Sequence, residues 1–430
     1  MKKYTKTGAA ALALAMVLSL AACGTTKSTG ASAGASGDAP AVASTANVVA
    51  DGATDVRDLF TDRDLTQTPD LSDAESLTVS DGDTLTITDE GVYVLSGSAE
   101  NAQIVVEATD TAKVQLVLDA LTVTNDDAPV IYVKSADKVF VTTTDSQNDL
   151  SVTGAFSADG DTNTDAVIFS KEDLVLNGVG TLTITSTENG VSCKDDLKVT
   201  GGTYLIDCAA DAIEANDSIS IADGSFTITT DKDGLHCEYD EDTSVGSIYI
   251  CGGTFDIEAG SDGIQGTTVT QIDGGTFTIT AGECIESTYV QINGGTLTLY
   301  GTDDGINASY KSAAVTPCLE ITGGEISITM AQGDTDALDS NGSLIVSGGT
   351  IDITAQFAFD YETTAEFTGG SITVNGETVT EITESMMMGG GMPGGGMMGG
   401  PGQMQGGMPG GMGGPGGQSG MGGMPGGGHP

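Results

Sequence analysis

The amino-acid sequence predicts an all-β protein whose main domain is a parallel β-helix, a solenoid of stacked coils with about 22 residues each. Three observations predict this fold. Short segments alternate polar and aliphatic residues, such as TLTIT (181–185) and TFTIT (276–280). Thr, Ile, Val and Gly dominate the same region, and few helix-favouring residues form a 3.6-residue stripe. Gly-Gly pairs then separate the segments at nearly regular intervals.

These turns set the period of the repeat. Successive turns are 22, 29, 22, 20, 29, 25 and 21 residues apart, counted from the first residue of each Gly-Gly or equivalent pair: Gly201, Asp223, Gly252, Gly274, Gly294, Gly323, Gly348 and Gly369. A leucine-rich horseshoe has a similar period, but it needs a Leu-x-x-Leu-x-Leu frame that is absent here. We therefore expect three strands and three corners in each coil, with the longer steps forming loops such as CEYDEDTSVGS (237–247).

The N-terminus is predicted to be a lipoprotein signal peptide covering residues 1–22. It has three lysines, an apolar run from 9 to 20 that is too short to span a bilayer, and Leu-Ala-Ala before Cys23. This arrangement resembles a bacterial lipobox, which implies cleavage before Cys23 and lipid attachment to its thiol. A plain secretory signal with a chance cysteine is the alternative. The expected location is extracytoplasmic, anchored to the membrane or cell surface by lipid alone.

The remaining segments divide the chain further. Residues 23–74 are expected to form a lipidated flexible linker and a lead-in to the fold, because residues 24–51 are rich in Ala, Ser, Thr and Gly and have little to bury. The β-helix is expected over residues 75–383, with about thirteen coils and almost no helix. Residues 384–430 are mostly Gly, Met and Pro, and are expected to be disordered. That tail fits a spacer or wall-interacting segment, although methionine thioethers also suit Cu(I).

One repeat position carries an acid in coil after coil. The acids are Asp211, Asp233, Asp262, Glu283, Asp304 and Asp336. Each is followed by a small residue and then by an aliphatic one: Ile213, Leu235, Ile264, Ile285, Ile306 or Leu338. Three residues after each acid comes Glu214, His236, Gln265, Glu286, Asn307 or Asp339. In a β-helix the aliphatic residue points inward, so we expect the polar residues to point outward and the acids to form a column on one side.

Such a column has an electrostatic problem. Coils stack about 4.8 Å apart, and two negative charges about 5 Å apart repel by roughly 1 kcal/mol in water and roughly 3 kcal/mol at an effective dielectric near 20. The acids must be well solvated, partly protonated or neutralised by a cation. The formal net charge is -47 and the only two arginines are Arg57 and Arg63, so Ca²⁺ is the expected partner and nucleic acid is excluded. The alternative is that each Asp merely shapes a corner.

Six cysteines lie within the predicted β-helix: Cys193, Cys208, Cys237, Cys251, Cys284 and Cys318. An even number in an exported protein is compatible with disulfides. However, Cys193 and Cys237 share a repeat position with Ala215 and Ser287, which favours small residues that point inward. Buried free thiols therefore stay at least as well supported as disulfides, and the chain has no Cys-x-x-Cys or Cys-His metal motif.

Several longer stretches resemble a known family. FTDRDLTQTPDL (60–71), VIFSKEDLVLNGVGTLTI (167–184) and VSCKDDLKVTGGTYLI (191–206) are similar to bacterial surface proteins described as a cellulose- and acidic-sugar-binding β-helix family. The resemblance covers nearly all of residues 60–383. It implies a right-handed, single-stranded parallel β-helix with bound calcium that binds acidic plant-type polysaccharide without known hydrolysis. By position it places Lys171, Glu172 and Asp173 one coil before Lys194, Asp195 and Asp196, with Asp217 one coil further on.

The acid column and this resemblance together give the candidate calcium ligands. They are Asp195, Asp196, Asp211, Glu214, Asp217, Asp233, Asp262, Asp304, Asp336 and Asp339. Because an acidic column and a polyuronate repel each other, recognition would need Ca²⁺ shared between protein and sugar carboxylates. Neutral glucan would instead need a flat aromatic platform. The chain has no Trp, and its tyrosines offer only a thin one: Tyr239, Tyr249, Tyr289, Tyr300 and Tyr310.

The expected function is therefore polysaccharide binding by a monomeric surface protein that is not an enzyme. A calcium-dependent lyase would need a strong base such as Arg or Lys, but no Arg lies in the β-helix and Lys is sparse. A hydrolase would need paired acids with His and basic groups, and His236 and His429 are the only histidines. A non-catalytic adhesin or spacer is the main alternative, since the fold alone permits either function.

Overall fold

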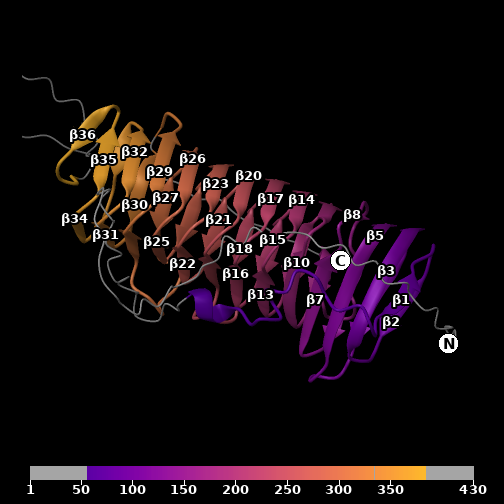
Figure 1. Ribbon diagram of the computed structural model, residues 1–430. Coiled ribbons are helices and arrows are strands. Elements are labelled where there is room, and N and C mark those ends of the chain that lie inside the picture. The colour runs from indigo at the N-terminus through magenta and orange to yellow at the C-terminus, as the bar shows by residue number, and fades with distance from the viewer. Residues whose placement is uncertain (1–55, 334, 384–430) are drawn as a thin grey trace, which may run out of the picture. The chain divides into compact units, whose positions relative to one another are not determined.

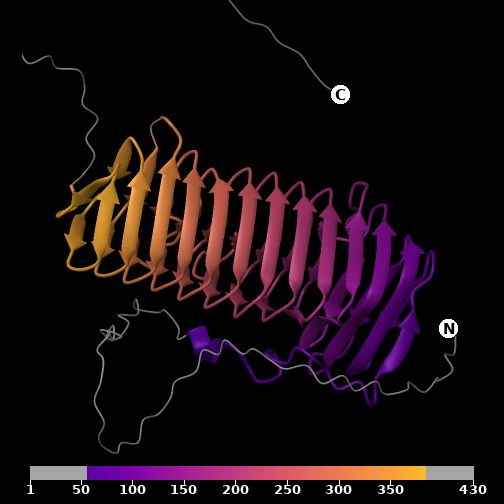
Figure 2. The same ribbon diagram turned by 45° about the horizontal axis from the view of Figure 1, so that its top comes forward.

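In the computed structural model, residues 56–333 and 335–383 are described, and they form the predicted parallel β-helix (Figures 1 and 2). The strands make three parallel ladders, and the chain contributes one strand to each ladder in every full coil. The third ladder is a separate sheet of 12 strands, close to the thirteen coils predicted. The only helical element among the described residues is a 3₁₀ turn, η1 (Val56–Leu59). The predicted signal peptide, Cys23 and the Gly/Met-rich tail lie outside the described residues.

The first two ladders belong to one sheet. The first contains β1 (Glu75–Thr78), β3 (Gly91–Glu100), β5 (Lys113–Asn125), β7 (Lys138–Thr143), β10 (Asp173–Gly178), β13 (Asp196–Val199), β16 (Ser218–Ile221), β19 (Ser247–Ile250), β22 (Val269–Ile272), β25 (Tyr289–Ile292), β28 (Cys318–Ile321), β31 (Ser343–Val346) and β34 (Thr364–Phe367). The second continues from the ends of β3 and β5 into β8 (Gln147–Val152), β11 (Thr181–Ser186), β14 (Thr203–Cys208), β17 (Ser225–Thr230), β20 (Thr254–Ala259), β23 (Thr276–Ala281), β26 (Thr296–Gly301), β29 (Glu325–Met330), β32 (Thr350–Thr354) and β35 (Ser371–Val374). A final strand, β36 (Glu377–Val379), pairs antiparallel with β35.

The third ladder carries the acid column at its edge. Its strands are β2 (Thr84–Ile87), β4 (Gln103–Glu107), β6 (Ile131–Ser135), β9 (Ala166–Ser170), β12 (Asn189–Cys193), β15 (Ile213–Ala215), β18 (Leu235–Cys237), β21 (Ile264–Gly266), β24 (Ile285–Ser287), β27 (Ile306–Ala308), β30 (Asp336–Ser340) and β33 (Phe357–Phe359). The aliphatic residues after the acids pair in register, as Ile213 does with Leu235 and Leu235 with Ile264. The 29-residue step from Asp233 to Asp262 is therefore accommodated in a loop, and the register of the strands does not change.

The Gly-Gly pairs mark the corner between the first and second ladders, and each glycine has a separate reason to be there. Gly275 has φ of +112°, a left-handed conformation that favours glycine. The preceding Gly274 lacks room for a side chain, because a Cβ there would lie 2.8 Å from the carbonyl oxygen of Cys251 in the previous coil. The pair therefore lets each coil turn tightly while lying directly against its neighbour.

The core is a set of columns in which like side chains stack. Ring centroids of Tyr204, Phe226, Phe255 and Phe277 lie 5.2, 4.7 and 4.6 Å apart in sequence, with stacked planes. Cys193 and Cys237 are fully buried at the position they share with Ala215 and Ser287, as the repeat predicted. Five cysteines are buried free thiols: Cys193, Cys208, Cys237, Cys284 and Cys318.

Residues 59–67 lie against the outer side of the first ladder. Asp64 is almost completely buried there, with its carboxylate 3.9 Å from the ammonium groups of both Lys138 and Lys198. The Gln67 side chain donates to the carbonyl oxygen of Thr200 at 2.9 Å and accepts from the amide of Gly178 at 2.8 Å. This strap, residues 59–67, falls in the region that sequence assigned to the linker and lead-in.

Candidate functional site

The acid column lies at the corner between the second and third ladders, where Asp211, Asp233 and Asp304 each accept a backbone amide of the next coil. The Oδ1 of Asp211 accepts the amide of Asp233 at 3.1 Å, and that of Asp233 accepts the amide of Asp262 at 2.8 Å. Asp304 accepts the amide of Asp336 in the same way at 3.0 Å. Asn189 begins the series by accepting the amide of Asp211. The corner role that sequence left as an alternative is therefore real for these acids.

Burial of the acids differs from the sequence expectation. Asp211, Asp233 and Asp262 are only 6%, 6% and 8% exposed, so solvation does not relieve their mutual repulsion. The aliphatic residues do point inward as expected, but the acids do not point freely into solvent. Their side chains turn along the stack toward the next coil, where they are covered by the polar residues of the third ladder. The repulsion must then be relieved by partial protonation or by an internal or bound countercharge.

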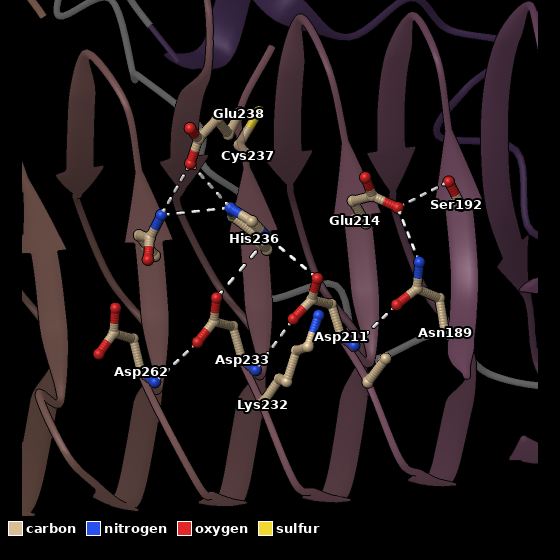
Figure 3. A network of polar contacts seen from close by, with 12 residues as sticks. Asn189, Ser192, Asp211, Glu214, Lys232, Asp233, His236, Cys237, Glu238 and Asp262 are labelled. Atoms are coloured by element: carbon tan, nitrogen blue, oxygen red, sulfur yellow. Dashed lines mark hydrogen bonds and ion pairs between the residues drawn. The ribbon is translucent and has the colours of Figure 1, made fainter. Parts of the chain in front are cut away.

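His236 supplies that charge for Asp211 and Asp233, the first two acids of the column (Figure 3). Its Nδ1 lies 3.1 Å from Asp211 Oδ2 and 3.6 Å from Asp233 Oδ2, and its Nε2 lies 3.2 Å from Glu238 Oε2. Burial alone would lower the pKa of His236, but the hydrogen bonds to Asp211 and Glu238 raise it to about 10. The imidazole is therefore a cation at neutral pH. Lys194 does the same for Glu214, with its Nζ 3.0 Å from Oε1.

These contacts correct the sequence argument on charge. The few basic residues were judged unable to supply the countercharge, but Asp211, Asp233 and Glu214 each have one nearby. The net charge of the whole chain did not reveal these pairs, because it does not say that His236 and Lys194 lie in contact with the acids. Sequence analysis placed His236 in the outward row and did not recognise it as the partner of Asp211. Its spacing in the repeat, one coil after Asp211 and three residues after Asp233, was the available signal.

Further along, the column is short of positive charge. Burial and neighbouring acids raise the pKa of Glu283 to about 8, of Asp262 to about 7 and of Asp304 to about 6. Among the described residues of this part of the column, Lys311 Nζ forms an ion pair with Glu286 Oε2 at 2.5 Å. Ligand oxygens of Asp262, Glu283 and Glu286 lie within 4.8 Å of one another. We call Asp262, Glu283, Glu286, Asp304 and Asn307 the oxygen cluster.

Asn307 sits within the oxygen cluster and is 7% exposed. Its amide nitrogen donates to Glu283 Oε2 at 3.2 Å and to Asp304 Oδ2 at 3.3 Å. Its Oδ1 is buried and has no hydrogen-bond partner. A buried acceptor without a donor is costly, and the same side chain lies against two of the crowded carboxylates through its amide nitrogen. An all-oxygen set with an unsatisfied amide oxygen fits a hard divalent cation such as Ca²⁺.

Asp339 and Asp336 extend this region into the next coil. Asp339 pairs in register with Asn307 on the outer face of the third ladder. Burial, followed by the charges of Asp304, Asp360 and Asp336, raises the pKa of Asp339 to about 7. Asp336 lies at the start of β30 and its amide is bound by Asp304.

The candidates taken from the family resemblance form a separate group at the opposite corner of the third ladder. Ligand oxygens of Asp173, Asp195 and Asp196 lie within 4.8 Å of one another. Burial, followed by the charges of Asp173, Asp196 and Asp217, raises the pKa of Asp195 to about 6. Lys138 Nζ lies 3.2 Å from Asp173 Oδ2. The ten predicted ligands therefore do not form one site: they divide between two corners and the face between them.

Comparison with known proteins identifies the family. Residues 81–337 match the family described as carbohydrate-binding domain-containing protein, which is more than half of the chain. The chain belongs to this carbohydrate-binding family. A carbohydrate-binding domain-containing protein of Acetivibrio thermocellus is 32% identical over 213 residues, covering 48% of this chain and 74% of that protein. The resemblance found in the sequence is thereby confirmed at the level of a bacterial carbohydrate-binding family.

This chain is also similar to a solved structure. It is that of the polysaccharide lyase-like protein from C. thermocellum, with 21% sequence identity and a TM-score of 0.32, covering 69% of this chain and 96% of that chain. Among the described residues, no helix is long and apolar enough to cross a membrane.

Proposed function

We propose that this protein is a lipid-anchored surface protein that binds an acidic polysaccharide through calcium. Membership of a carbohydrate-binding family supports a sugar ligand. The oxygen cluster supports the cation, and the observation that carries it is the buried, unpartnered Oδ1 of Asn307 among acids with raised pKa values. Bound there, Ca²⁺ would accept oxygen ligands from the sugar as well as from the protein, since it takes six to eight of them in loose geometry.

The residues of this chain have distinct parts in such a site. Asp262, Glu283 and Glu286 would hold the ion, and Asn307 would complete the set with its amide oxygen. The Asp304 carboxylate also fixes the next coil through the amide of Asp336, so it would keep the cluster in register. Lys311, which already pairs with Glu286, would reduce repulsion toward an incoming uronate carboxylate.

We further propose that binding is not accompanied by catalysis. A lyase needs a base that is neutral at working pH and free to take a proton. His236 has a pKa of about 10 and carboxylates against both ring nitrogens, so it holds its proton. Lys311 beside the oxygen cluster is also a poor base, because Glu286 raises its pKa against the lowering effect of burial.

Neutral glucan is less well supported as the ligand. Of the tyrosines considered for an aromatic platform, Tyr249 is buried and Tyr289 donates its hydroxyl to Glu320 at 2.6 Å. Tyr300 and Tyr310 are exposed by 42% and 66%. They come from the second ladder and from a loop after the third, so these residues do not offer a common flat surface to a glucan chain.

Retention on immobilised polygalacturonate tests the function, with Ca²⁺ in one arm and EGTA in the other. We expect Ca²⁺ to strengthen retention and EGTA to weaken it, together with calorimetric Ca²⁺ binding. Absence of Ca²⁺ binding at millimolar concentration would defeat the calcium proposal and favour an adhesin or spacer. A glycan array with and without Ca²⁺ would then identify the sugar. The anchor is tested by Cys23→Ala, which should release the protein from the membrane fraction, whereas retention after a high-salt wash would contradict lipid attachment.

A further inference from the structure

A row of lysines runs up the outer face of the third ladder in its early coils. Val133 pairs with Ser170 and Ser170 with Cys193, so the residues that follow them, Lys134, Lys171 and Lys194, occupy one repeat position in three successive coils. Stacked positions of this kind are about 4.8 Å apart. In a chain with 61 acids and only 14 Lys and Arg, this is a local reversal of charge.

Two aromatic rings lie beside this row. Tyr132 of β6 and Phe169 of β9 pair in register, with centroids 5.7 Å apart and an edge-to-face geometry. Lys134 and Lys171 lie 4.8 and 5.9 Å from the centroid of the Tyr132 ring, and Lys194 lies 5.7 Å from that of Phe169. Together with Ala166 the rings form a small apolar cluster separate from the main core. We call Tyr132, Phe169, Lys134 and Lys171 the aromatic–lysine face.

Aromatic rings beside lysine ammonium groups are suited to bind an acidic sugar. The apolar face of a sugar ring packs against an aromatic side chain, and its carboxylate pairs with a lysine ammonium group. Lys194 pairs at 3.0 Å with Glu214, whose side chain is only 17% exposed, whereas the partner of Lys134 is the exposed Asp159. A linear chain of uronate residues along the stack would meet the two lysines in succession.

The loop of residues 153–165 covers this face. It joins β8 to β9, and it closes in a hairpin where Asp159 and Thr162 are bridged and Gly160 has φ of +63°. Under it Tyr132 and Phe169 are 2% and 0% exposed, although residues 157–161 of the loop are themselves exposed. The base of the loop is held separately, by the Ser157 amide on the carbonyl oxygen of Asp127 at 2.8 Å.

The contacts of the loop tip are those that a uronate carboxylate would make. Asp159 Oδ2 lies 2.7 Å from Lys134 Nζ and accepts the Tyr132 hydroxyl at 3.2 Å. Lys171 Nζ donates to the Thr162 hydroxyl at 2.8 Å, a neutral oxygen that leaves its charge unpaired in this contact. The Asp159 side chain is 52% exposed, so the contact is open to competition from solution.

We propose that the aromatic–lysine face is a second binding site for a carboxylate-bearing sugar chain, independent of calcium, and that Asp159 on the covering loop occupies the place of the sugar carboxylate. The ligand class rests on the proposed function, whereas the site and its independence of calcium go beyond it. Binding would exchange the Asp159 carboxylate for one of the sugar and lift the loop tip from the rings.

Calorimetry with oligogalacturonate in EGTA tests the site in the full chain. Asp159→Asn removes the competing charge and should tighten binding roughly two- to fivefold, the range expected for loss of an exposed ion pair. Asp161→Asn is the matched control, because it removes an equal charge from the same hairpin, whereas the loop contacts of the two lysines are to Asp159 and Thr162. A double variant, Lys134→Gln with Lys171→Gln, should abolish binding in EGTA, and a neutral cello-oligosaccharide should bind no variant.

The two proposals fail in different ways. Equal affinities of the Asp159→Asn and Asp161→Asn variants, or unchanged binding by the double lysine variant, would overturn this site even if Ca²⁺-dependent retention persists. Conversely, binding in EGTA that Ca²⁺ does not increase would overturn the calcium site and leave this one standing. Circular dichroism and thermal melting of each variant establish that the β-helix is intact, so that a loss of affinity reports on the face itself.

Discussion

The His236 imidazole Nδ1 lies 3.1 Å from Asp211 Oδ2, joining residues 25 positions apart in the sequence across two adjacent coils. Asp211 already uses its other oxygen to hold the amide of Asp233. One buried carboxylate thus both fixes the register of two coils and binds a countercharge. The contact divides the acid column into a part that this chain neutralises itself and a part, around Asn307, that has a single lysine.

His236→Gln should destabilise the protein in a pH-dependent way. The pKa of His236 is about 10 in the folded protein and about 6.5 in an unfolded chain, so the folded state holds the proton more tightly. The stabilisation is therefore complete below about pH 6.5 and is lost as pH rises toward 10. We expect the variant to lose roughly 1.5–3 kcal/mol at pH 6 and much less at pH 10, measured by urea unfolding. A difference that grows with pH would contradict the imidazolium assignment.

The repeat made the fold predictable, because stacking forces equivalent residues into register. The pairing of Ile213 with Leu235, the inward position of Cys193 and the need for Gly-Gly at each corner follow from local spacing. The division of the acids between two corners was harder to foresee. Asp195 follows β12 and Asp233 precedes β18, so they lie at opposite ends of third-ladder strands, and only a correct assignment of strand and corner distinguishes them.

Contacts made by the longer segments were not predictable in this way. Lys311 reaches Glu286 from a loop that the repeat treats as an insertion, and Asp159 reaches Lys134 from another. The strap reaches Lys138 and Lys198 from the segment that sequence assigned to the linker and lead-in. Each contact depends on how a non-repeating segment folds back over the stack, and the repeat contains no information about that path.

Phe255→Ala should be strongly destabilising, because Phe255 is at the centre of the ring stack. Its centroid lies 4.7 and 4.6 Å from those of Phe226 and Phe277, and it is 1% exposed. Truncation would leave a cavity between coils and cost about 3–5 kcal/mol in urea unfolding. Phe255→Leu is the control and should cost less than about 1.5 kcal/mol, since Leu297 occupies the same position two coils on. Equal losses in the two variants would show that the stack is not a close-packed column.

The strap should loosen when its lysine contact is removed. Lys198 Nζ donates to the carbonyl oxygen of Leu59 at 2.5 Å and lies near the buried Asp64 carboxylate. Arg63, 4.5 Å over the Phe140 ring, is a trypsin site held within the same segment. We expect Lys198→Gln to speed tryptic cleavage after Arg63 roughly five- to tenfold, because a charged hydrogen bond that holds the strap is lost.

The control is Lys113→Gln, which removes an exposed ion pair in the first ladder and should leave the rate of cleavage after Arg63 nearly unchanged. Equal rates in the two variants would mean that Lys198 does not hold the strap.

Calcium should stabilise the protein through the oxygen cluster and not through the neutralised part of the column. A ligand that binds only the folded state raises the melting temperature by mass action, so Ca²⁺ should raise it and EGTA should reverse the rise. The double variant Asp262→Asn with Glu283→Gln removes two of the ligand carboxylates and should lose this response. Its melting temperature without Ca²⁺ should equal or exceed that of the parent, because two repelling charges are gone.

Asp211→Asn is the matched variant for this comparison. It keeps an Oδ1 that can accept the amide of Asp233, and it lies in the part of the column that His236 already neutralises. It should therefore melt lower than the parent, having lost the ion pair with His236, yet keep the full rise in melting temperature on Ca²⁺ addition. A response to Ca²⁺ that survives in the double variant and disappears in Asp211→Asn would move the cation to the His236 region, and the unpartnered oxygen of Asn307 would then need another explanation.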